Sequence, residues 1–412
     1  MDVIRIELVS MKNLLIITTR YPHEQDKISA TYIKAQVDVL KKSFEKVVVI
    51  STTPYIPMIL TKFLMKKRSR DALAMDYSYD NVDVYFTKDL VLPFEFSKQR
   101  WGGKAYNKMM KILNRINFKP DIVHAHRTWP TAYSAMLLSK ETGTPYVVTA
   151  HGYDAYGLPY ESEKWCSLLN AALSPAKKII AVSERNSKVL SEVVKIPKEK
   201  LVVIPNGYDE NMLHPIDKKI ARKKLGLPLD KKIILSVGFL YEVKGYNYLI
   251  QAAHEIISHH KDVLFVIVGD GNSRVQLEKQ IEELKLKDRF LLVGNKDFSE
   301  IPYWMNAADI FTLSSNDEGV PTVLFEAIGC GKPYVGTNVG GIPEIVINDK
   351  LGLLVPPKEP KQLAAAMEKA MMVKWDQKYI LEHAERYTWN IISNEILNIY
   401  NEALNSKSST KQ

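Results

Sequence analysis

Short runs of apolar, largely β-branched residues alternate with longer amphipathic stretches along all 412 residues of the chain. The runs are continuous instead of alternating, which indicates strands buried on both faces, as in a parallel sheet. Most gaps between the runs leave room for a crossover helix. The pattern predicts strands at 13–19, 46–51, 82–87, 121–126, 145–150, 178–183 and 201–205 in the first half, and at 232–238, 263–269, 290–294, 310–314, 332–337 and 352–355 in the second.

The chain is longer than one hydrophobic core usually serves, so the strands are expected to form two α/β domains in series. The turn-rich segment Pro205-Asn206-Gly207 follows a predicted strand and is the expected boundary. Ligands of doubly wound sheets bind at the carboxyl ends of the strands, which predicts a site in a cleft between the domains. We therefore predict a first Rossmann-like domain over 1–206, a second over 207–385, a helix over 386–405 that packs back on the first domain, and a tail over 406–412.

Charge is distributed unevenly between the two halves. The net charge is +9, but residues 1–206 hold 31 Lys and Arg against 20 Asp and Glu, whereas the remainder holds 25 against 27. This bias suggests an anionic partner for the first half, such as a phosphorylated lipid, a membrane surface or an acidic glycan, with ordinary surface lysine as the alternative. No helix-turn-helix, zinc-finger or RNP pattern accompanies the charge, so a nucleic-acid partner is not expected.

The cysteine count and hydropathy point to a cytoplasmic protein. Two cysteines, Cys166 and Cys330, provide neither a disulfide framework nor a zinc-binding spacing. No apolar run reaches the length of a membrane span, and the first ten residues are too short and too charged for a signal peptide. The stretch 54–70 mixes large apolar residues with five cations, which suits either a helix packed on the sheet or an element lying on the inner face of the cell membrane.

The strongest chemical signal lies in the segment 317–346. Glu318 and Glu326 are eight residues apart, and Pro321 marks the start of a helix. The free amides at that start, around Val320 to Val323, and the helix dipole favour an anion such as a diphosphate. A carboxylate can accept two hydrogen bonds from paired sugar hydroxyls. Without further context, a capping residue beside a surface charge is the simpler interpretation.

The same segment resembles glycosyltransferase family 4, also called group 1. The family's two glutamates separated by seven residues, its Gly-Lys-Pro strand and its Gly-Gly-x-Pro-Glu turn match Glu318, Glu326, Gly331 to Pro333 and Gly340 to Glu344. Further matches are SVGFLYEVKG (236–245), VGDGNS (268–273), IPNGYD (204–209) and GLLVPP (352–357). The resemblance implies the GT-B fold, in which two Rossmann-like domains face each other across a deep cleft, and transfer of a sugar with retention of anomeric configuration.

The resemblance also implies roles for individual residues. Glu326 would hold the ribose hydroxyls of the nucleotide, Glu318 would contact the donor sugar, and Lys244 would neutralise the departing diphosphate. His151, in a His-Gly-x-Asp setting, matches the family's active-site histidine. The remaining donor-side residues are Gly319, Val320, Pro321, Thr322, Gly238, Phe239, Gly269, Gly294 and Asn206, and the candidates for the acceptor side are Arg20, Tyr21, His126 and Asp154.

Two positions depart from the family pattern. Phe239 stands where members commonly have an arginine that contacts the phosphates, and Arg274 and Arg20 are candidates to replace that cation. Ala30 stands in the loop after the first strand where a glycine is expected, which makes close approach of the backbone to phosphate harder. His124 shares a strand face with His126, and packing and ligand binding are both consistent with that placement.

These observations predict a retaining transferase that moves a sugar from a UDP- or GDP-linked donor to a glycan or lipid-linked acceptor in cell-surface polysaccharide synthesis. No cofactor or metal is expected, since the chain has no Asp-x-Asp motif and no Gly-x-Gly-x-x-Gly. A nucleotide-sugar epimerase with the same architecture and a non-catalytic nucleotide-sugar-binding scaffold are the alternatives. A retaining glycosidase also uses two carboxylates but needs no phosphate cradle.

Overall fold

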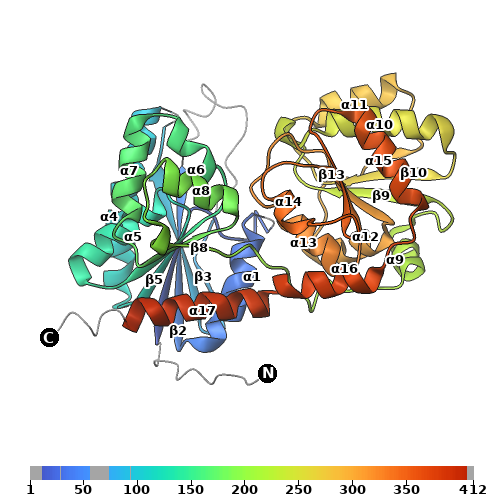
Figure 1. Cartoon of the computed structure of the whole chain (residues 1–412). Helices are drawn as coiled ribbons and strands as arrows, with labels where there is room; N and C mark the ends of the chain where they lie inside the picture. The colour runs from blue at the N-terminus through green and yellow to red at the C-terminus, as the bar shows by residue number, and fades with distance from the viewer. Residues whose placement is uncertain (1–11, 28, 56–73, 93, 406–412) are drawn as a thin grey trace. The chain divides into compact units, whose positions relative to one another are not determined.

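The computed structural model describes residues 12–27, 29–55, 74–92 and 94–405 (Figure 1). The chain divides into two compact units: Met1–Pro205 with Asn390–Gln412 form unit 1, and Asn206–Trp389 form unit 2. The structure thus places the change of unit between Pro205 and Asn206, in the turn-rich segment of the sequence. Most of the basic apolar stretch 54–70 lies outside the described residues, as does the tail after residue 405.

Unit 1 is built on an eight-stranded sheet of order β3-β4-β2-β1-β5-β6-β7-β8. Its pairings are parallel except for the antiparallel pair of β3 and β4. The central strands β5 and β6 are buried along their whole length, as the apolar runs predict. The strands are β1 (Asn13–Thr18), β2 (Lys46–Tyr55), β3 (Tyr77–Tyr79), β4 (Val82–Leu90), β5 (Ile122–His126), β6 (Tyr146–Ala150), β7 (Lys178–Ala181) and β8 (Leu201–Val203).

Helices flank this sheet, and several carry local start and stop signals (Figure 1). The Ser162 and Ser183 side chains cap α7 and α8, and Gly143 ends α5 in the left-handed conformation. The helices are α1 (Thr31–Leu40), α3 (Glu95–Gln99), α4 (Trp101–Arg115), α5 (Thr131–Thr142), α6 (Tyr153–Tyr156), α7 (Glu163–Leu173) and α8 (Glu184–Glu192).

The last helix of the chain, α17 (Trp389–Asn405), returns to unit 1 (Figure 1). Its Tyr400 is fully buried, donates or accepts a hydrogen bond at 2.6 Å with His124 of β5, and packs edge-on against Phe44. The apolar face seen in the sequence is therefore covered by the sheet of unit 1.

Unit 2 has a six-stranded, fully parallel sheet of order β11-β10-β9-β12-β13-β14. All six residues of β10 are buried, which fits a strand covered by helices on both faces. The strands are β9 (Lys232–Val237), β10 (Val263–Val268), β11 (Phe290–Leu292), β12 (Ile310–Leu313), β13 (Tyr334–Thr337) and β14 (Gly352–Val355). The helices are α9 (Lys218–Leu225), α10 (Tyr246–His259), α11 (Arg274–Glu283), α12 (Ile301–Ala307), α13 (Thr322–Gly329), α14 (Ile342–Ile345), α15 (Pro360–Met372) and α16 (Gln377–Ala384).

All the strands expected from the apolar runs are present, which confirms the prediction of two parallel α/β sheets. Within the described ranges the sequence pattern missed one strand, β3 (Tyr77–Tyr79), because three partly polar residues carry no apolar run. None of the helices in the described ranges combines the length and apolar character that a membrane span requires.

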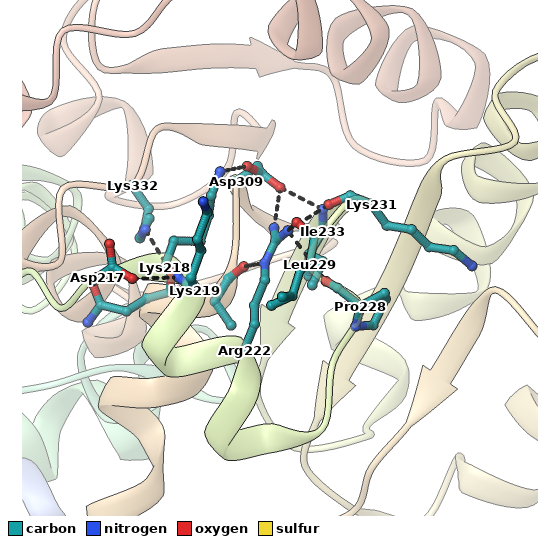
Figure 2. Close-up of polar contacts among 12 residues, drawn as sticks. Asp217, Lys218, Lys219, Arg222, Pro228, Leu229, Lys231, Ile233, Asp309 and Lys332 are labelled. Carbon is teal, nitrogen blue, oxygen red and sulfur yellow. Dashed lines mark hydrogen bonds and ion pairs between the residues drawn. The ribbon is translucent and has the colours of Figure 1, made fainter.

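A buried polar network holds the start of unit 2 together, at the amino ends of β9 and β12 (Figure 2). Arg222 of α9 is 2% exposed and donates to the carbonyls of Ala307, Leu229 and Lys231 and, over 2.7 Å, to Asp309. The same carboxylate accepts from Lys218 and from the Ile233 amide. Burial alone would raise the pKa of Asp309, but the Lys218 and Ile233 hydrogen bonds and the two cations outweigh it and lower that pKa.

Replacing Asp309 by asparagine is expected to lower the free energy of unfolding by about 2 kcal/mol at pH 7, because charge-assisted hydrogen bonds are lost. A carboxylate whose pKa is lowered by folding stabilises above the unfolded value of 3.8, and this contribution is lost as the pH falls through the folded pKa. The difference from wild type in urea unfolding should therefore narrow below pH 4. The exposed Asp349→Asn substitution is the control and should change little; an equal effect at both positions would contradict the prediction.

Candidate active site

Two predicted catalytic residues form an ion pair in unit 2. Lys244 ends the short turn η5 (Glu242–Lys244) after β9, and Glu318 lies in the loop between β12 and α13. Lys244 Nζ is 2.6 Å from Glu318 Oε1, and the Ser315 hydroxyl donates to the same oxygen over 2.6 Å. The side chains are only 20% and 10% exposed, so solvent screens their charges weakly.

Backbone contacts explain how residues 74 positions apart meet. The Ser314 hydroxyl donates to the Lys244 carbonyl over 3.0 Å, and the Asn316 amide donates to the Val243 carbonyl over 2.7 Å. Gly245 has a φ of +62°, and a Cβ at this position would lie 2.1 Å from the Ser314 carbonyl oxygen. Only glycine therefore allows the loop after β9 to approach the loop after β12 this closely.

The Gly-Gly-x-Pro-Glu turn supports the backbone next to Glu318. The Gly341 amide donates to the Gly319 carbonyl over 2.7 Å. Gly340 has a φ of +58°, and a Cβ there would lie 2.0 Å from the Glu318 carbonyl oxygen. This turn fixes the entry into α13, whose N-cap residue is Pro321.

Glu326 lies in α13, one helical turn after the predicted anion-binding start. No hydrogen bond or ion pair reaches its carboxylate from the residues that the structure describes. The residue is only partly buried, yet burial of the carboxylate raises its pKa to about 7. Near the same helix start, Val320 and Pro321 are buried and Thr322 is partly exposed. A desolvated carboxylate without a protein partner is suited to a ligand that donates hydrogen bonds.

Three predicted glycines meet at the carboxyl ends of β9, β10 and β11. A Cβ at Gly269 would lie 1.9 Å from the Gly238 carbonyl oxygen, and the Gly269 amide donates to the Gly294 carbonyl over 2.9 Å. Gly238 also lies close to Lys244, because a Cβ at Gly238 would lie 3.9 Å from the Lys244 Cε. The structure therefore brings these glycines to the same sheet edge as the Lys244–Glu318 pair.

Phe239 occupies the position of the family's arginine and is 41% exposed, stacked on Tyr241 with ring centroids 5.5 Å apart. The proposed substitute, Arg274, bonds to Glu278 over 2.7 Å and to the Leu292 carbonyl over 3.1 Å. Its guanidinium is thus held at the carboxyl ends of β10 and β11. Asn206 lies at the start of unit 2 and is buried.

In unit 1, His151 follows β6 and is 8% exposed. Its Nε2 is 2.9 Å from Nδ1 of His126, the last residue of β5. The Tyr32 ring of α1 lies 5.0 Å from the His151 ring. The structure therefore brings His126, predicted for the acceptor side, into direct contact with the predicted catalytic histidine.

Asp154 connects the loops that follow β5 and β6. Its Oδ2 accepts from the Thr128 amide and its Oδ1 from the Gly152 amide, each over 2.9 Å. Thr128 donates in return to the Asp154 carbonyl over 2.6 Å. The carboxylate is 6% exposed, and these bonds join the loop after β5 to the segment Gly152–Asp154 that follows His151.

Tyr21 and Arg20 lie in the loop after β1. Tyr21 is 1% exposed, and its hydroxyl pairs with that of Tyr79 over 2.8 Å, so its side chain packs inside unit 1. Arg20 is exposed. Ala30, in the same loop, caps α1 with φ 56° and ψ 33°, the left-handed conformation that glycine prefers.

Ala30→Gly is therefore expected to raise the free energy of unfolding by about 0.5–1 kcal/mol, since relief of the left-handed strain exceeds the entropy that glycine adds to the unfolded chain. Ala365→Gly, at an exposed position inside α15, is the contrast and should lower stability by about 1 kcal/mol. Urea unfolding measures both. A loss at Ala30 equal to that at Ala365 would contradict the prediction.

Several residues that take part in these contacts were not predicted from the sequence. Ser314 and Ser315 directly follow β12, and Arg127 directly follows β5. Arg127 has a φ of +88° and its guanidinium is 4.0 Å from Asp154. All three stand at carboxyl ends of strands, and this position was the available signal.

Comparison with known proteins agrees with this arrangement. The family profile described as "Glycosyl transferases group 1" matches residues 217–387, and the profile "Glycosyltransferase Family 4" matches residues 71–211. TuaC of Bacillus subtilis, which carries the provisional name of teichuronic acid biosynthesis glycosyltransferase, is 27% identical over 86% of this chain and 88% of its own. The UDP-Gal:alpha-D-GlcNAc-diphosphoundecaprenol alpha-1,3-galactosyltransferase of Escherichia coli is 29% identical over 68% of this chain and 72% of its own.

Solved structures share the fold. Sucrose-phosphate synthase from Thermosynechococcus elongatus superposes with a TM-score of 0.76 at 19% identity, over 96% of this chain and all of that one. HepE from Anabaena, solved in complex with UDP, superposes with a TM-score of 0.71 at 20% identity, over 95% of this chain and all of that one. The two α/β units are thus those of the GT-B fold. With both family profiles matched in chain order, the protein belongs to the family 4, or group 1, glycosyltransferases.

Proposed function

We propose that this protein transfers a sugar, with retention of anomeric configuration, from a nucleoside-diphosphate sugar to a glycan or lipid-linked acceptor in polysaccharide synthesis. The observation that carries the proposal is the donor-side group of unit 2. A desolvated carboxylate without a protein partner, Glu326, and a cation paired to a carboxylate, Lys244 with Glu318, flank the start of α13.

Each part of that group suits one part of the donor. The ionised Glu326 accepts hydrogen bonds from the ribose hydroxyls, and the amides and dipole at the start of α13 stabilise the diphosphate. Lys244 leaves Glu318 for the diphosphate as the anomeric C–O bond breaks, because negative charge then grows on the leaving oxygen. Glu318 is released to accept hydrogen bonds from the donor sugar. His151 supplies a further hydrogen bond to the transferring sugar.

Uridine is the base that we propose, and the cations of the protein take the place of a divalent metal. HepE, solved with UDP and with UDP-glucose, and the galactosyltransferase named for a UDP-Gal donor support the choice of uridine. The name of that galactosyltransferase also contains a diphosphoundecaprenol acceptor, and this supports a lipid-linked acceptor for the basic first half of the chain.

Thermal unfolding with a panel of nucleoside diphosphates and their sugars tests the proposal. A ligand at 100 times its Kd stabilises the folded protein by about 2.7 kcal/mol, so a rise in Tm with UDP and one UDP-sugar is expected, unchanged by EDTA. If none of these ligands raised the Tm of the folded protein, the result would favour a non-catalytic scaffold. Epimerised donor recovered without any acceptor would favour the epimerase, and loss of activity in EDTA restored by magnesium would contradict the metal-free mechanism.

A further inference from the structure

Three histidines of unit 1 lie in one buried row. His124 and His126 project from the same face of β5, with ring centroids 4.3 Å apart and an interplanar angle of 27°. His151, after β6, continues the row at 5.2 Å and 14° from His126. His124 and His126 are fully buried and His151 is 8% exposed.

His124, at one end of the row, forms hydrogen bonds with both of its ring nitrogens. His124 Nδ1 is 2.6 Å from the Tyr400 hydroxyl of α17, and its Nε2 is 2.7 Å from the Thr149 hydroxyl of β6. The C-terminal helix and the neighbouring strand therefore fix the ring on which His126 stacks. His126 in turn has its orientation restricted from one side by packing and from the other by its bond to His151.

His126 and His151 share a single hydrogen bond, and each has one further ring nitrogen. His126 Nδ1 and His151 Nε2 are 2.9 Å apart, whereas His126 Nε2 and His151 Nδ1 have no hydrogen-bond partner among the described residues. Burial, together with the nearby His124 and Arg127, lowers the pKa of both imidazoles. Their other titratable neighbours are Tyr32 of α1 and Asp154 of α6. Both rings are therefore neutral, with one proton each.

Only two arrangements of these protons are consistent with the hydrogen bond. If His126 donates from Nδ1, its Nε2 is a bare acceptor and His151 carries its proton on Nδ1. If His151 donates from Nε2, the free N–H lies on His126 instead. An unpaired buried N–H is less tolerated than an unpaired acceptor, so the N–H is expected on the residue that keeps some exposure, His151 at 8% against 0% for His126.

We propose that His126 is a positioning residue that donates to His151 and thereby makes His151 Nδ1–H a hydrogen-bond donor toward the transferring sugar. The inference deepens the proposed function and depends on it for the identity of the substrate. It assigns to His126 no proton transfer and no contact with the reacting atoms. The unpaired, buried Nδ1 of His151 is the atom that substrate would satisfy.

The tautomer can be read directly on the full chain labelled with ¹⁵N-histidine, without donor or acceptor. NMR is expected to show the His151 proton on Nδ1, with the His151 signals identified by their loss in His151→Gln. His126→Asp, which can only accept, should move that proton to Nε2, whereas His126→Asn keeps an amide donor and should leave it on Nδ1. A wild-type proton on Nε2, or a tautomer indifferent to His126, overturns the inference even if no sugar transfer is found.

Kinetics supply the second readout. His126→Ala is expected to lower kcat about 100-fold with the Kd of UDP unchanged, and His126→Asn should recover most of that loss. In His126→Asp the acidic partner raises the pKa of His151, so activity should rise as the pH falls and protonation restores Nδ1–H. His124→Asn disturbs the same stack without touching the bond and is the matched control. The same loss and the same pH profile in all four variants would reduce His126 to a packing residue.

Discussion

Replacing Lys244 by methionine is expected to lower kcat for sugar transfer by about 10²–10³-fold while the Kd of UDP rises much less. The ammonium sits 2.6 Å from Glu318 in a largely buried pair, so its field is weakly screened there. Negative charge on the diphosphate grows as the anomeric bond breaks, and the loss should fall on the transition state more than on the bound ground state. Steady-state kinetics with the UDP-sugar selected by thermal unfolding measure the split between kcat and KM.

Two control variants separate this effect from general damage. Lys287 forms a Lys–Glu pair of similar length, 2.5 Å to Glu282, but both side chains are largely exposed. Lys287→Met should leave kcat unchanged because exposed pairs contribute little. The double variant Lys244→Met with Glu318→Gln removes the unpaired buried carboxylate and should regain stability without regaining activity. A Lys244→Met enzyme with wild-type kcat would remove Lys244 from the mechanism.

Phe239 makes stabilisation of the diphosphate more dependent on Lys244. In this chain the exposed Phe239 stacks on Tyr241 and can offer no charge to a phosphate. Arg274, the substitute that the sequence suggests within unit 2, is engaged by Glu278 and the Leu292 carbonyl. Lys244 is then the cation that the described structure places against the predicted sugar-binding glutamate, and the loss on its removal should be correspondingly large.

The strand pattern was predictable because burial on both faces leaves a strong local signal. The all-apolar run of β10 marks its strand without reference to any other part of the chain. The edge strand β3 has no buried residue, and its pairing with β4 depends on tertiary context that no local pattern carries. For this reason β3 could not be predicted from local sequence.

The candidate site also has some features that local sequence predicts and others that only the fold reveals. Glu318 and Glu326 could be placed around a helix start from Pro321 and the spacing alone, and α13 begins at Thr322. The contact of Glu318 with Lys244 crosses 74 residues and depends on Gly245 at positive φ, so only the fold reveals it. Likewise, the bonds from Asp154 to Thr128 and Gly152 depend on two loops meeting at one sheet edge.

Glu326→Ala is expected to weaken UDP binding about 100-fold, because two hydrogen bonds to a charged acceptor are worth about 3 kcal/mol together. Titration calorimetry between pH 6 and pH 8 adds a sharper test. The free carboxyl has a pKa of about 7, and the ribose hydroxyls bind its ionised form. Affinity should therefore rise about tenfold across this range in wild type. Glu326→Gln cannot ionise and should show only the smaller change that the diphosphate itself contributes.

Stability should respond to Glu326 in the opposite direction to binding. Folding raises the pKa of this carboxyl from 4.5 to about 7, so the folded state loses stability as the pH rises through that interval. At pH 8 the free energy of unfolding of Glu326→Gln, measured in urea, should consequently exceed that of wild type by about 2 kcal/mol. This gain should vanish as the pH falls below about 4.5. Both results are expected together if the Glu326 carboxylate serves to bind the ligand and destabilises the protein in the absence of ligand. If Glu326→Gln bound UDP as wild type does, with the same pH dependence, the ribose role would be wrong, whatever its effect on stability.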